Sequence, residues 1–265
     1  MKLSIISLNY NRLEFTKLHL ENLINTTDVE CELIVVSNSD NKRSRQVREH
    51  IKQSNISGGK VKKVIKVLNH NNYGVAGGRN SGLVYASGEF KIVIDDDIIM
   101  PENWATKIIT LLEGIEKVGV AGYCVEKDRA AKKYKIKTYN DTVFQSKGRD
   151  NIGGACLMIS PKTFKKLGYF CEDYETFGFE DADYGSRVAA LGMINAYVYP
   201  ERAEQMKDII NNSAYFVWKK SKYNSKMLRS RFEHNLNEYA NRRNLYIGKK
   251  RLKKKENKII ISESI

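Results

Sequence analysis

Proline and long apolar runs are both scarce in this sequence. Only 3 prolines occur among 265 residues, so we expect most of the chain to fold rather than to form a proline-rich linker. No apolar run approaches the roughly 20 residues that a membrane-spanning helix needs. The apolar stretch at residues 3–8 is too short for a secretory signal and has no small-residue cleavage site after it. We therefore expect neither a membrane span nor a secretory precursor.

Cysteine is also scarce, and its spacing excludes two further kinds of protein. The 4 cysteines are far apart in the chain, and no two of them form a CxxC pair. They are Cys31, Cys124, Cys156 and Cys171. This pattern predicts reduced thiols in the core of a cytoplasmic protein, and it argues against a disulfide scaffold and a zinc site.

Acidic residues become scarce toward the end of the chain. Residues 201–265 hold 17 Lys and Arg against 7 Asp and Glu, a net charge of +10, whereas the first 200 residues hold 28 against 24, a net charge of +4. Three interpretations of this basic region stay open. It is a solvated helical appendage, a surface that attaches to anionic membrane at roughly 1 kcal/mol per basic residue, or a nucleic-acid-binding surface that neutralises phosphates.

The first 70 residues alternate between two hydrophobic periodicities. Short apolar runs at residues 3–8, 32–36 and 61–68 predict strands, and amphipathic segments from residue 13 and at 42–53 predict helices. Strand, helix, strand, helix, strand is the order of a parallel sheet that is covered by helices. The sequence therefore predicts an α/β protein.

An acidic triplet, Asp95-Asp96-Asp97, ends the next apolar strand, residues 90–94. Three adjacent carboxylates repel one another and gain nothing from packing. They suit a divalent cation and its phosphate ligands at the carboxyl end of a strand, where open α/β sheets place ligands. A solvated acidic turn is the alternative interpretation.

A glycine-rich stretch, residues 71–82, precedes that strand. We interpret it as a turn that leads into a helix at 80–86, because glycines let a backbone approach a ligand and a helix N-terminus attracts phosphate. The spacing matches neither a Walker loop nor a dinucleotide fingerprint.

The second half of the chain continues the alternation. A helix is expected at 103–117, a strand at 118–123, a long loop or hairpin at 126–150, a bulged strand at 151–160, a short helix at 161–167 and an apolar helix at 184–191. Three acids, Glu180, Asp181 and Asp183, stand just before the last of these helices. Asp183 suits a helix cap, whereas Glu180 and Asp181 together exceed what capping requires.

Four segments in this order resemble the family 2 glycosyltransferases. They are the turn 9–12, the loop 72–82, the acidic strand end 95–97, and the pair formed by 153–155 and 178–183. Members of that family have the GT-A fold, a Rossmann-like α/β domain that uses nucleotide-sugar donors. The resemblance implies a GT-A domain over residues 1–205, with a mixed, mostly parallel sheet flanked by helices. A basic, mainly helical extension is expected over 206–265.

The resemblance also implies roles for individual residues. Those expected to bind the donor are Asn9, Tyr10, Asn11, Arg12, Ser37, Asn72, Gly74, Arg79, Asn80, Asp95 and Asp96. Those expected to hold Mn²⁺ or Mg²⁺ are Asp97, as the last residue of a DXD-like triplet, and Asp95. Those expected to line the sugar and acceptor pocket are Gly153, Gly154 and Phe179. Those expected to be catalytic are Asp181 and Glu180. Of these, Asp181 matches the general base of the inverting members.

Elementary chemistry agrees with two separate acidic sites. Glycosyl transfer needs a neutralised diphosphate leaving group, which a carboxylate-held cation supplies. It also needs a base within hydrogen-bond reach of the acceptor hydroxyl.

Two positions depart from the family pattern. Ser37 stands where members commonly carry an aspartate that reads uracil, so the nucleobase is selected less strongly. His234 is the histidine available beyond the Glu-Asp pair to complete a metal site, and a surface histidine on a polar helix is its alternative interpretation.

These observations predict a metal-dependent, inverting glycosyltransferase of the hexosyltransferase type. A UDP-sugar is the expected donor, and an envelope glycan or lipid-linked saccharide is the expected acceptor, with the protein cytoplasmic or peripheral at the inner membrane face. Two alternatives stay open: a phage-type enzyme that glycosylates modified DNA bases, and a non-catalytic polyanion-binding protein on the same fold.

Overall fold

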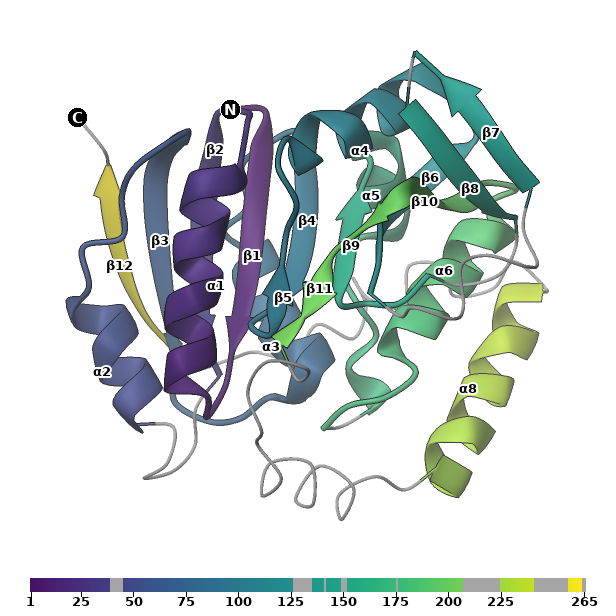
Figure 1. Cartoon of the computed structure of the whole chain (residues 1–265). Coiled ribbons are helices and arrows are strands. Elements are labelled where there is room, and N and C mark those ends of the chain that lie inside the picture. Colours follow the sequence, from purple (N-terminus) through teal and green to yellow (C-terminus); the bar gives the residue numbers. More distant parts are fainter. Residues whose placement is uncertain are drawn as a thin grey trace.

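Ten strands form one continuous sheet in the computed structural model, which describes residues 1–38, 45–125, 135–140, 142–148, 152–174, 176–206, 225–240 and 257–263 (Figure 1). Their order across the sheet is β12-β3-β2-β1-β4-β9-β6-β10-β8-β7. The bounds are β1 (Leu3–Asn9), β2 (Cys31–Ser37), β3 (Val61–Asn69), β4 (Phe90–Asp95), β6 (Val118–Cys124), β7 (Lys135–Tyr139), β8 (Thr142–Gly148), β9 (Cys156–Ile159), β10 (Ile194–Arg202) and β12 (Asn257–Glu263). Two short strands, β5 (Ile98–Ile99) and β11 (Glu204–Gln205), pair with each other outside this sheet.

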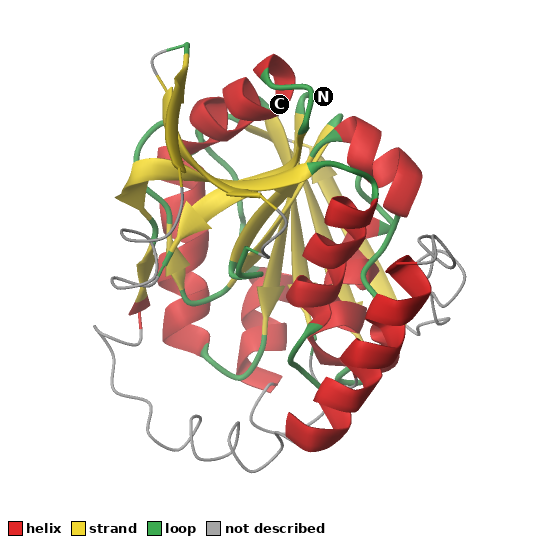
Figure 2. Ribbon diagram, turned by 90° about the vertical axis from the view of Figure 1, so that its right-hand side faces the viewer, coloured by secondary structure: helices red, strands yellow, loops and turns green. Residues whose placement is uncertain are grey.

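Helices cover both faces of the sheet (Figure 2). The helices described are α1 (Leu13–Thr26), α2 (Arg45–Gln53), α3 (Gly74–Leu83), α4 (Trp104–Gly114), α5 (Pro161–Leu167), the 3₁₀ helix η1 (Glu172–Tyr174), α6 (Glu180–Ala190) and α8 (Ser225–Ala240). One core cluster joins α1, α2 and α4 to the sheet, and the other joins α3, α5 and α6 to it. Because helices cover both faces, every residue of β1 and β2 is buried, and exposure does not alternate along these strands.

The central strands run parallel and end at a common edge. β1 pairs in parallel with β2 and β4, and β2 pairs in parallel with β3. In this register Asn9 lies opposite Ser37 and Leu8 lies opposite Asp95. β9 is antiparallel to both of its neighbours, β4 and β6. The sheet is therefore mixed, and the turns that follow β1, β2 and β4 meet at its carboxyl edge, where α/β sheets bind ligands.

The predicted helix at 161–167 is present with the expected start. Pro161 is its first residue, and the Ser160 side chain accepts a hydrogen bond from the Thr163 amide at 3.2 Å. The predicted hairpin within 126–150 is also present as β7 and β8, which pair antiparallel.

The glycine-rich segment is a helix rather than a turn. We expected helix to begin at residue 80, but α3 begins at Gly74. A β-carbon on Gly78 would lie 2.5 Å from Leu8 Cδ1, and one on Gly82 would lie 2.5 Å from Ile6 Cγ2. These two glycines therefore serve close packing of α3 on β1, which sequence reasoning had interpreted as close approach to a ligand.

The acidic segment before residue 184 is likewise helical. α6 begins at Glu180, so Glu180, Asp181 and Asp183 lie in its first turn instead of preceding the helix. Its N-cap is Phe179, which has a left-handed φ of 63° and makes no side-chain capping bond. Gly178, with φ 106°, comes just before it.

The four cysteine side chains are buried, and none forms a disulfide, as the sequence predicted. In the part of the chain that the structure describes, no helix is long and apolar enough to cross a membrane.

The C-terminal region contributes a helix and a strand to the body of the protein. α8 packs against α6, and β12 pairs antiparallel with β3 at the edge of the main sheet (Figure 1). The sequence did not predict β12. The aromatic and basic segments 215–222 and 249–255 lie outside the described residues, and the division at residues 205 and 206 stays a prediction.

Candidate active site

A pocket lies at the carboxyl edge of the sheet, between the end of β4 and the start of α3. Its empty volume is about 640 Å³ when the part open to solvent is included. Seven of the predicted donor and metal residues line it: Tyr10, Arg12, Asn72, Gly74, Asp95, Asp96 and Asp97. The sequence therefore located this pocket from three separate segments.

Arg12 balances much of the charge of the acidic triplet. Its Nη1 donates to Asp97 Oδ2 at 2.9 Å, and its Nη2 donates to Asp96. All three side chains are at least 90% buried. Sequence reasoning assigned the relief of repulsion in the triplet to a cation alone, and the structure adds a buried guanidinium. Ion pairs at this depth hold their geometry because unpaired buried charge is costly.

Asp96 is the most buried member of the triplet. Its Oδ2 accepts from the Tyr10 amide at 3.1 Å. Burial raises the pKa of Asp96 to about 7, although the charge of Arg12 opposes this. Asp96 thus fixes the turn after β1 against the end of β4.

Asp97 is the predicted metal ligand, and it faces the pocket. Its Oδ2 also accepts from Gln205 Nε2 at 3.1 Å, and its backbone carbonyl accepts from the Met206 amide at 2.8 Å. Carboxylate oxygens are the donors that Mn²⁺ and Mg²⁺ take, commonly one or two of them with phosphate and water completing the shell. Among the described residues no three His, Cys, Asp or Glu side chains form a ready-made metal cluster. The residue types fit a cation bound by Asp97, with Asp95, and a diphosphate.

Arg79 joins the triplet to the second acidic site. Its Nη2 donates to Asp95 Oδ1 at 2.8 Å and to the Gly154 carbonyl at 2.8 Å, and its Nη1 donates to Glu180 Oε1 at 3.2 Å. Burial lowers the pKa of Arg79, but the charges of Asp95 and Glu180 outweigh this and raise it. We expected Arg79 to bind the donor. It is fully buried and is not among the residues that line the pocket, and it holds two acidic segments together.

Glu180 and Asp181 differ in their environment. Glu180 is buried, and its Oε2 accepts from the Gly178 amide at 2.8 Å. Burial and the neighbouring Asp181 raise the pKa of Glu180 to about 7, against the effect of Arg79. Asp181 is half-buried, and its Oδ2 accepts from the Gly154 amide at 2.9 Å. Asp181 is therefore the more accessible carboxylate of the two.

An asparagine network builds the side of the pocket between the end of β2 and the start of α3. Asn38 Nδ2 donates to Asn72 Oδ1 at 3.0 Å and to the Gly74 carbonyl at 2.9 Å, and its Oδ1 accepts from Asn69 Nδ2 at 3.1 Å. These bonds fix the start of α3 against the end of β2. Ser37, the predicted base-reading position, is fully buried and does not line the pocket, whereas Asn38 does.

Several predicted residues support the site from outside the pocket. Asn9 is buried, and its Nδ2 donates to Ser7 Oγ at 2.9 Å. Asn80 is also buried, and it exchanges hydrogen bonds with the Phe170 backbone at 2.9 Å in both directions. Asn11 has a left-handed φ of 58° in the turn after β1.

The predicted acceptor residues lie on the Asp181 side. The Gly153 amide donates to the Tyr197 hydroxyl at 2.7 Å. A β-carbon on Gly154 would lie 2.9 Å from Asp181 Cβ, so this position has no room for a side chain. His234 is exposed on α8 and is not among the residues that line the pocket.

Sequence reasoning missed six residues that line the pocket: Leu8, Asn38, Val75, Thr176, Phe177 and Gln205. Asn38 could have been found, because it follows the end of β2 as the acidic triplet follows β4. Gln205 carries no local signal, since it reaches Asp97 only through the pairing of β11 with β5.

The fold and the pocket define the class of protein: a GT-A domain, with an acidic triplet at the carboxyl end of β4. Residues 4–168 match the glycosyl transferase family 2, and the chain belongs to that family. This confirms the predicted family and fold. The match ends before α6, so it does not include Glu180 and Asp181.

Solved glycosyltransferase structures share this fold. The mannosyltransferase PcManGT from Pyrobaculum calidifontis, in complex with GDP-Man and Mn²⁺, has a TM-score of 0.58 and 18% identity over 82% of this chain and 59% of that one. GalNAc-T7 with UDP, GalNAc and Mn²⁺ has a TM-score of 0.58 and 15% identity, over 77% of this chain and 44% of that one. S. aureus TarS 1-349 in complex with UDP-GlcNAc has a TM-score of 0.55 and 18% identity, over 77% of this chain and 58% of that one. The chain thus spans less than two thirds of each, and at these identities the likeness establishes the fold alone. No curated protein matches the sequence.

Proposed function

We propose that this protein is a metal-dependent, inverting glycosyltransferase that moves a sugar from a nucleoside-diphosphate sugar to a hydroxyl acceptor. The observation that carries the proposal is the Arg79 bridge. A single buried guanidinium binds Asp95 at the end of β4 and Glu180 at the start of α6. It brings the two acidic sites, which are far apart in the sequence, to opposite sides of one residue.

The acidic triplet serves the leaving group in this proposal. Asp97 and Asp95 would hold Mn²⁺ or Mg²⁺, which supplies Lewis-acid neutralisation of the diphosphate when bound. Arg12 and Gln205 orient Asp97, and Asp96 anchors the turn after β1 through the Tyr10 amide. The neighbours whose structures contain Mn²⁺ and a nucleotide or nucleotide sugar support this assignment.

Asp181 is the general base in the same proposal. It takes the proton from the acceptor hydroxyl as the new glycosidic bond forms and the bond to the diphosphate breaks. The Gly154 amide fixes one carboxylate oxygen, and the Ala182 amide fixes the other at 2.7 Å. Glu180 is buried and bound to Arg79, so it positions the turn rather than receiving the proton.

We propose a UDP-sugar as the donor, of hexosyltransferase type. Asn38 lines the pocket and would contact the nucleoside, whereas Ser37 is fully buried. An envelope glycan or lipid-linked saccharide is the proposed acceptor. The non-catalytic polyanion-binding protein is an outcome of the test below. The phage-type enzyme differs in its acceptor, so transfer to DNA with modified bases would identify it.

The test is a panel of UDP-glucose, UDP-GlcNAc and GDP-mannose, incubated with the full chain and Mn²⁺ in the absence of acceptor. We expect slow release of nucleoside diphosphate from one donor, lost in Asp97→Asn and on chelation of the metal. Lys162→Ala is a matched control, because Lys162 pairs with Glu116 at 2.9 Å on the exposed side of α5. The proposal would be contradicted if the protein bound neither UDP nor GDP and released nucleoside diphosphate from none of the donors.

A further inference from the structure

The helix α8 packs beside the part of α6 that carries Asp181. Figure 1 shows α8 beside α6, and α8 also contacts η1. Leu228 and Tyr239 of α8 are buried in a cluster with Cys171 and Tyr174. Both α6 and α8 lie beyond the residues that match the family. The family match therefore does not describe how α8 packs on α6, and the structure of this chain does.

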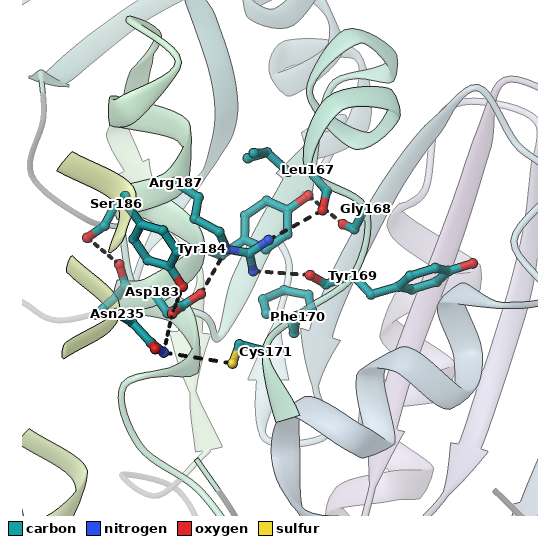
Figure 3. A network of polar contacts seen from close by, with 12 residues as sticks. Leu167, Gly168, Tyr169, Phe170, Cys171, Asp183, Tyr184, Ser186, Arg187 and Asn235 are labelled. Carbon is teal, nitrogen blue, oxygen red and sulfur yellow. Dashed lines mark hydrogen bonds and ion pairs between the residues drawn. The ribbon is translucent and has the colours of Figure 1, made fainter. Parts of the chain in front are cut away.

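A buried carboxylate holds α8 on α6. Asp183 is fully buried, and it accepts hydrogen bonds from Tyr174 Oη at 2.8 Å, Arg187 Nε at 2.8 Å and Asn235 Nδ2 at 3.3 Å (Figure 3). The Tyr239 hydroxyl also donates to it. Two of these four donors come from α8. A buried charge that loses a donor is penalised, so this network fixes one position of α8 on α6.

Arg187 completes the network on the side away from α8. Its Nη2 donates to the Tyr169 carbonyl at 3.1 Å and its Nη1 to the Leu167 carbonyl at 3.4 Å (Figure 3). The pair of Asp183 and Arg187 thus links α6 to the segment after α5. If one contact from α8 is lost, Asp183 still keeps its ion pair.

A second contact reaches the turn that aims Asp181. The ring of Phe232 on α8 lies 5.1 Å from the ring of Phe179, centroid to centroid. Phe179 has φ 63° and follows Gly178 with φ 106°. A left-handed φ in a phenylalanine costs on the order of 1 kcal/mol or more, so it persists where neighbouring groups enforce it. Phe232 is such a neighbour, and Phe179 is two residues before Asp181.

We propose that α8 is a positioning element for Asp181. Phe232 holds Phe179, and Asn235 holds Asp183, so that the first turn of α6 keeps the orientation that sugar transfer needs. Phe232 and Asn235 act through α6, which makes them positioning residues. The inference rests on the proposed function, in which Asp181 is the general base.

Two substitutions distinguish positioning of Asp181 by α8 from a general contribution of α8 to the stability of the fold. Phe232→Leu removes the ring but keeps an apolar side chain. Asn235→Leu removes the amide at similar volume, while Asp183 keeps Tyr174, Arg187 and Tyr239. We expect each variant to lower the single-turnover rate of nucleoside-diphosphate release, with water as acceptor, by about tenfold to a hundredfold, the effect of misplacing a catalytic group by about 1 Å. UDP and Mn²⁺ affinity should not change, because both bind at the end of β4.

Two further variants serve as controls. Ser230→Ala lies on the exposed face of α8 and should keep the parent rate. Phe232→Tyr keeps a ring at the contact and should restore most of the rate that Phe232→Leu loses. Equal losses of rate and of UDP affinity in Phe232→Leu and Asn235→Leu would indicate general destabilisation and overturn the proposal.

Hydrogen exchange supplies a readout that does not depend on activity. In both leucine variants of the full chain, the backbone amides of residues 176–184 should exchange faster than in the parent, whereas those of β1 and β2 should not change. Unchanged exchange, or a parent-like rate in both variants, would overturn the role of α8. A parent protein that releases nucleoside diphosphate from no donor would instead refute the proposed function, and exchange alone would then decide whether α8 holds the turn.

Discussion

Asp97 Oδ2 lies 2.9 Å from Arg12 Nη1, so the candidate metal ligand is already held by a buried guanidinium. The same oxygen accepts from Gln205 at 3.1 Å. A cation bound by Asp97 therefore shares this carboxylate with Arg12 or takes its place. Substitutions of Asp97 and of Arg12 therefore both test the proposed metal site.

Asp97→Asn should abolish Mn²⁺-dependent donor binding and leave the protein folded. The amide removes the charge that a cation needs, while Arg12 keeps its pair with Asp96. Isothermal titration with Mn²⁺ and UDP measures the binding, and a thermal unfolding midpoint near that of the parent shows that the fold is intact. A variant that binds both as tightly as the parent would show that the metal assignment is wrong.

Arg12→Gln should make the protein depend on divalent cations for stability. Removal of the buried guanidinium leaves Asp96 and Asp97 uncompensated, which costs about 3–5 kcal/mol for a broken buried pair. Mn²⁺ should then raise the unfolding midpoint more in the variant than in the parent, because it binds the folded state. The measurement is thermal unfolding with and without Mn²⁺. An identical shift in both proteins would mean that Arg12 does not share the metal site.

Asp181→Asn should lower transfer by ~10²–10⁴, the usual contribution of a general base. UDP affinity should change little, because the diphosphate is held at the end of β4. If Asp181 served the helix terminus alone, the amide would be nearly silent, since asparagine is also a good cap. Glu180→Gln is the comparison: it should reduce the rate less and the stability more, because Glu180 is buried against Arg79. Single-turnover rates and unfolding midpoints of the two variants distinguish these roles.

His19 should make the protein less stable as the pH falls. It is fully buried on α1, with Nδ1 2.6 Å from the Ile98 carbonyl, and burial lowers its pKa to about 4. The unfolded chain takes up a proton near pH 6.5, but the folded protein does so only near 4. The free energy of unfolding therefore falls by up to about 1.4 kcal/mol per pH unit across that window.

His19→Gln should flatten this dependence. Urea unfolding at pH 7 and pH 5 measures it for parent and variant. If both lost the same free energy between the two values, other groups would be responsible.

The role of the basic residues in 249–255 is best tested by substitution rather than by deletion of the C-terminal segment. Removal of residues 249–265 would also remove β12, whose Ile259 and Ile260 pack against the two core clusters. Replacement of the six Lys and Arg in 249–255 by Gln keeps β12. We expect weaker attachment to anionic vesicles, with a smaller dependence on salt than the parent shows, because each basic residue that is removed takes away a salt-screened attraction. Vesicle and DNA binding between low and high salt measure it. Unchanged binding of both would mean a solvated appendage.

The sequence by itself determined the elements whose cause is local. Apolar runs placed β1, β2, β3, β4, β6 and β9, and Pro161 after Ser160 placed α5 at its observed bounds. The acidic triplet at the end of an apolar strand predicted a ligand site, and the structure places the three carboxylates at a pocket. Hydrophobic periodicity and turn chemistry act over a few residues, so they can be read without the fold.

The tertiary structure alone decided which side chains meet. Arg79 and Glu180 are 101 positions apart, and no local pattern links them. The glycines of α3 illustrate the same limit: a missing β-carbon accommodates either a ligand or a neighbouring strand, and only the position of β1 shows that Gly78 and Gly82 serve packing. β12 joins β3 across nearly 190 residues of chain. Such partners depend on the path of the backbone through space, which sequence spacing does not encode.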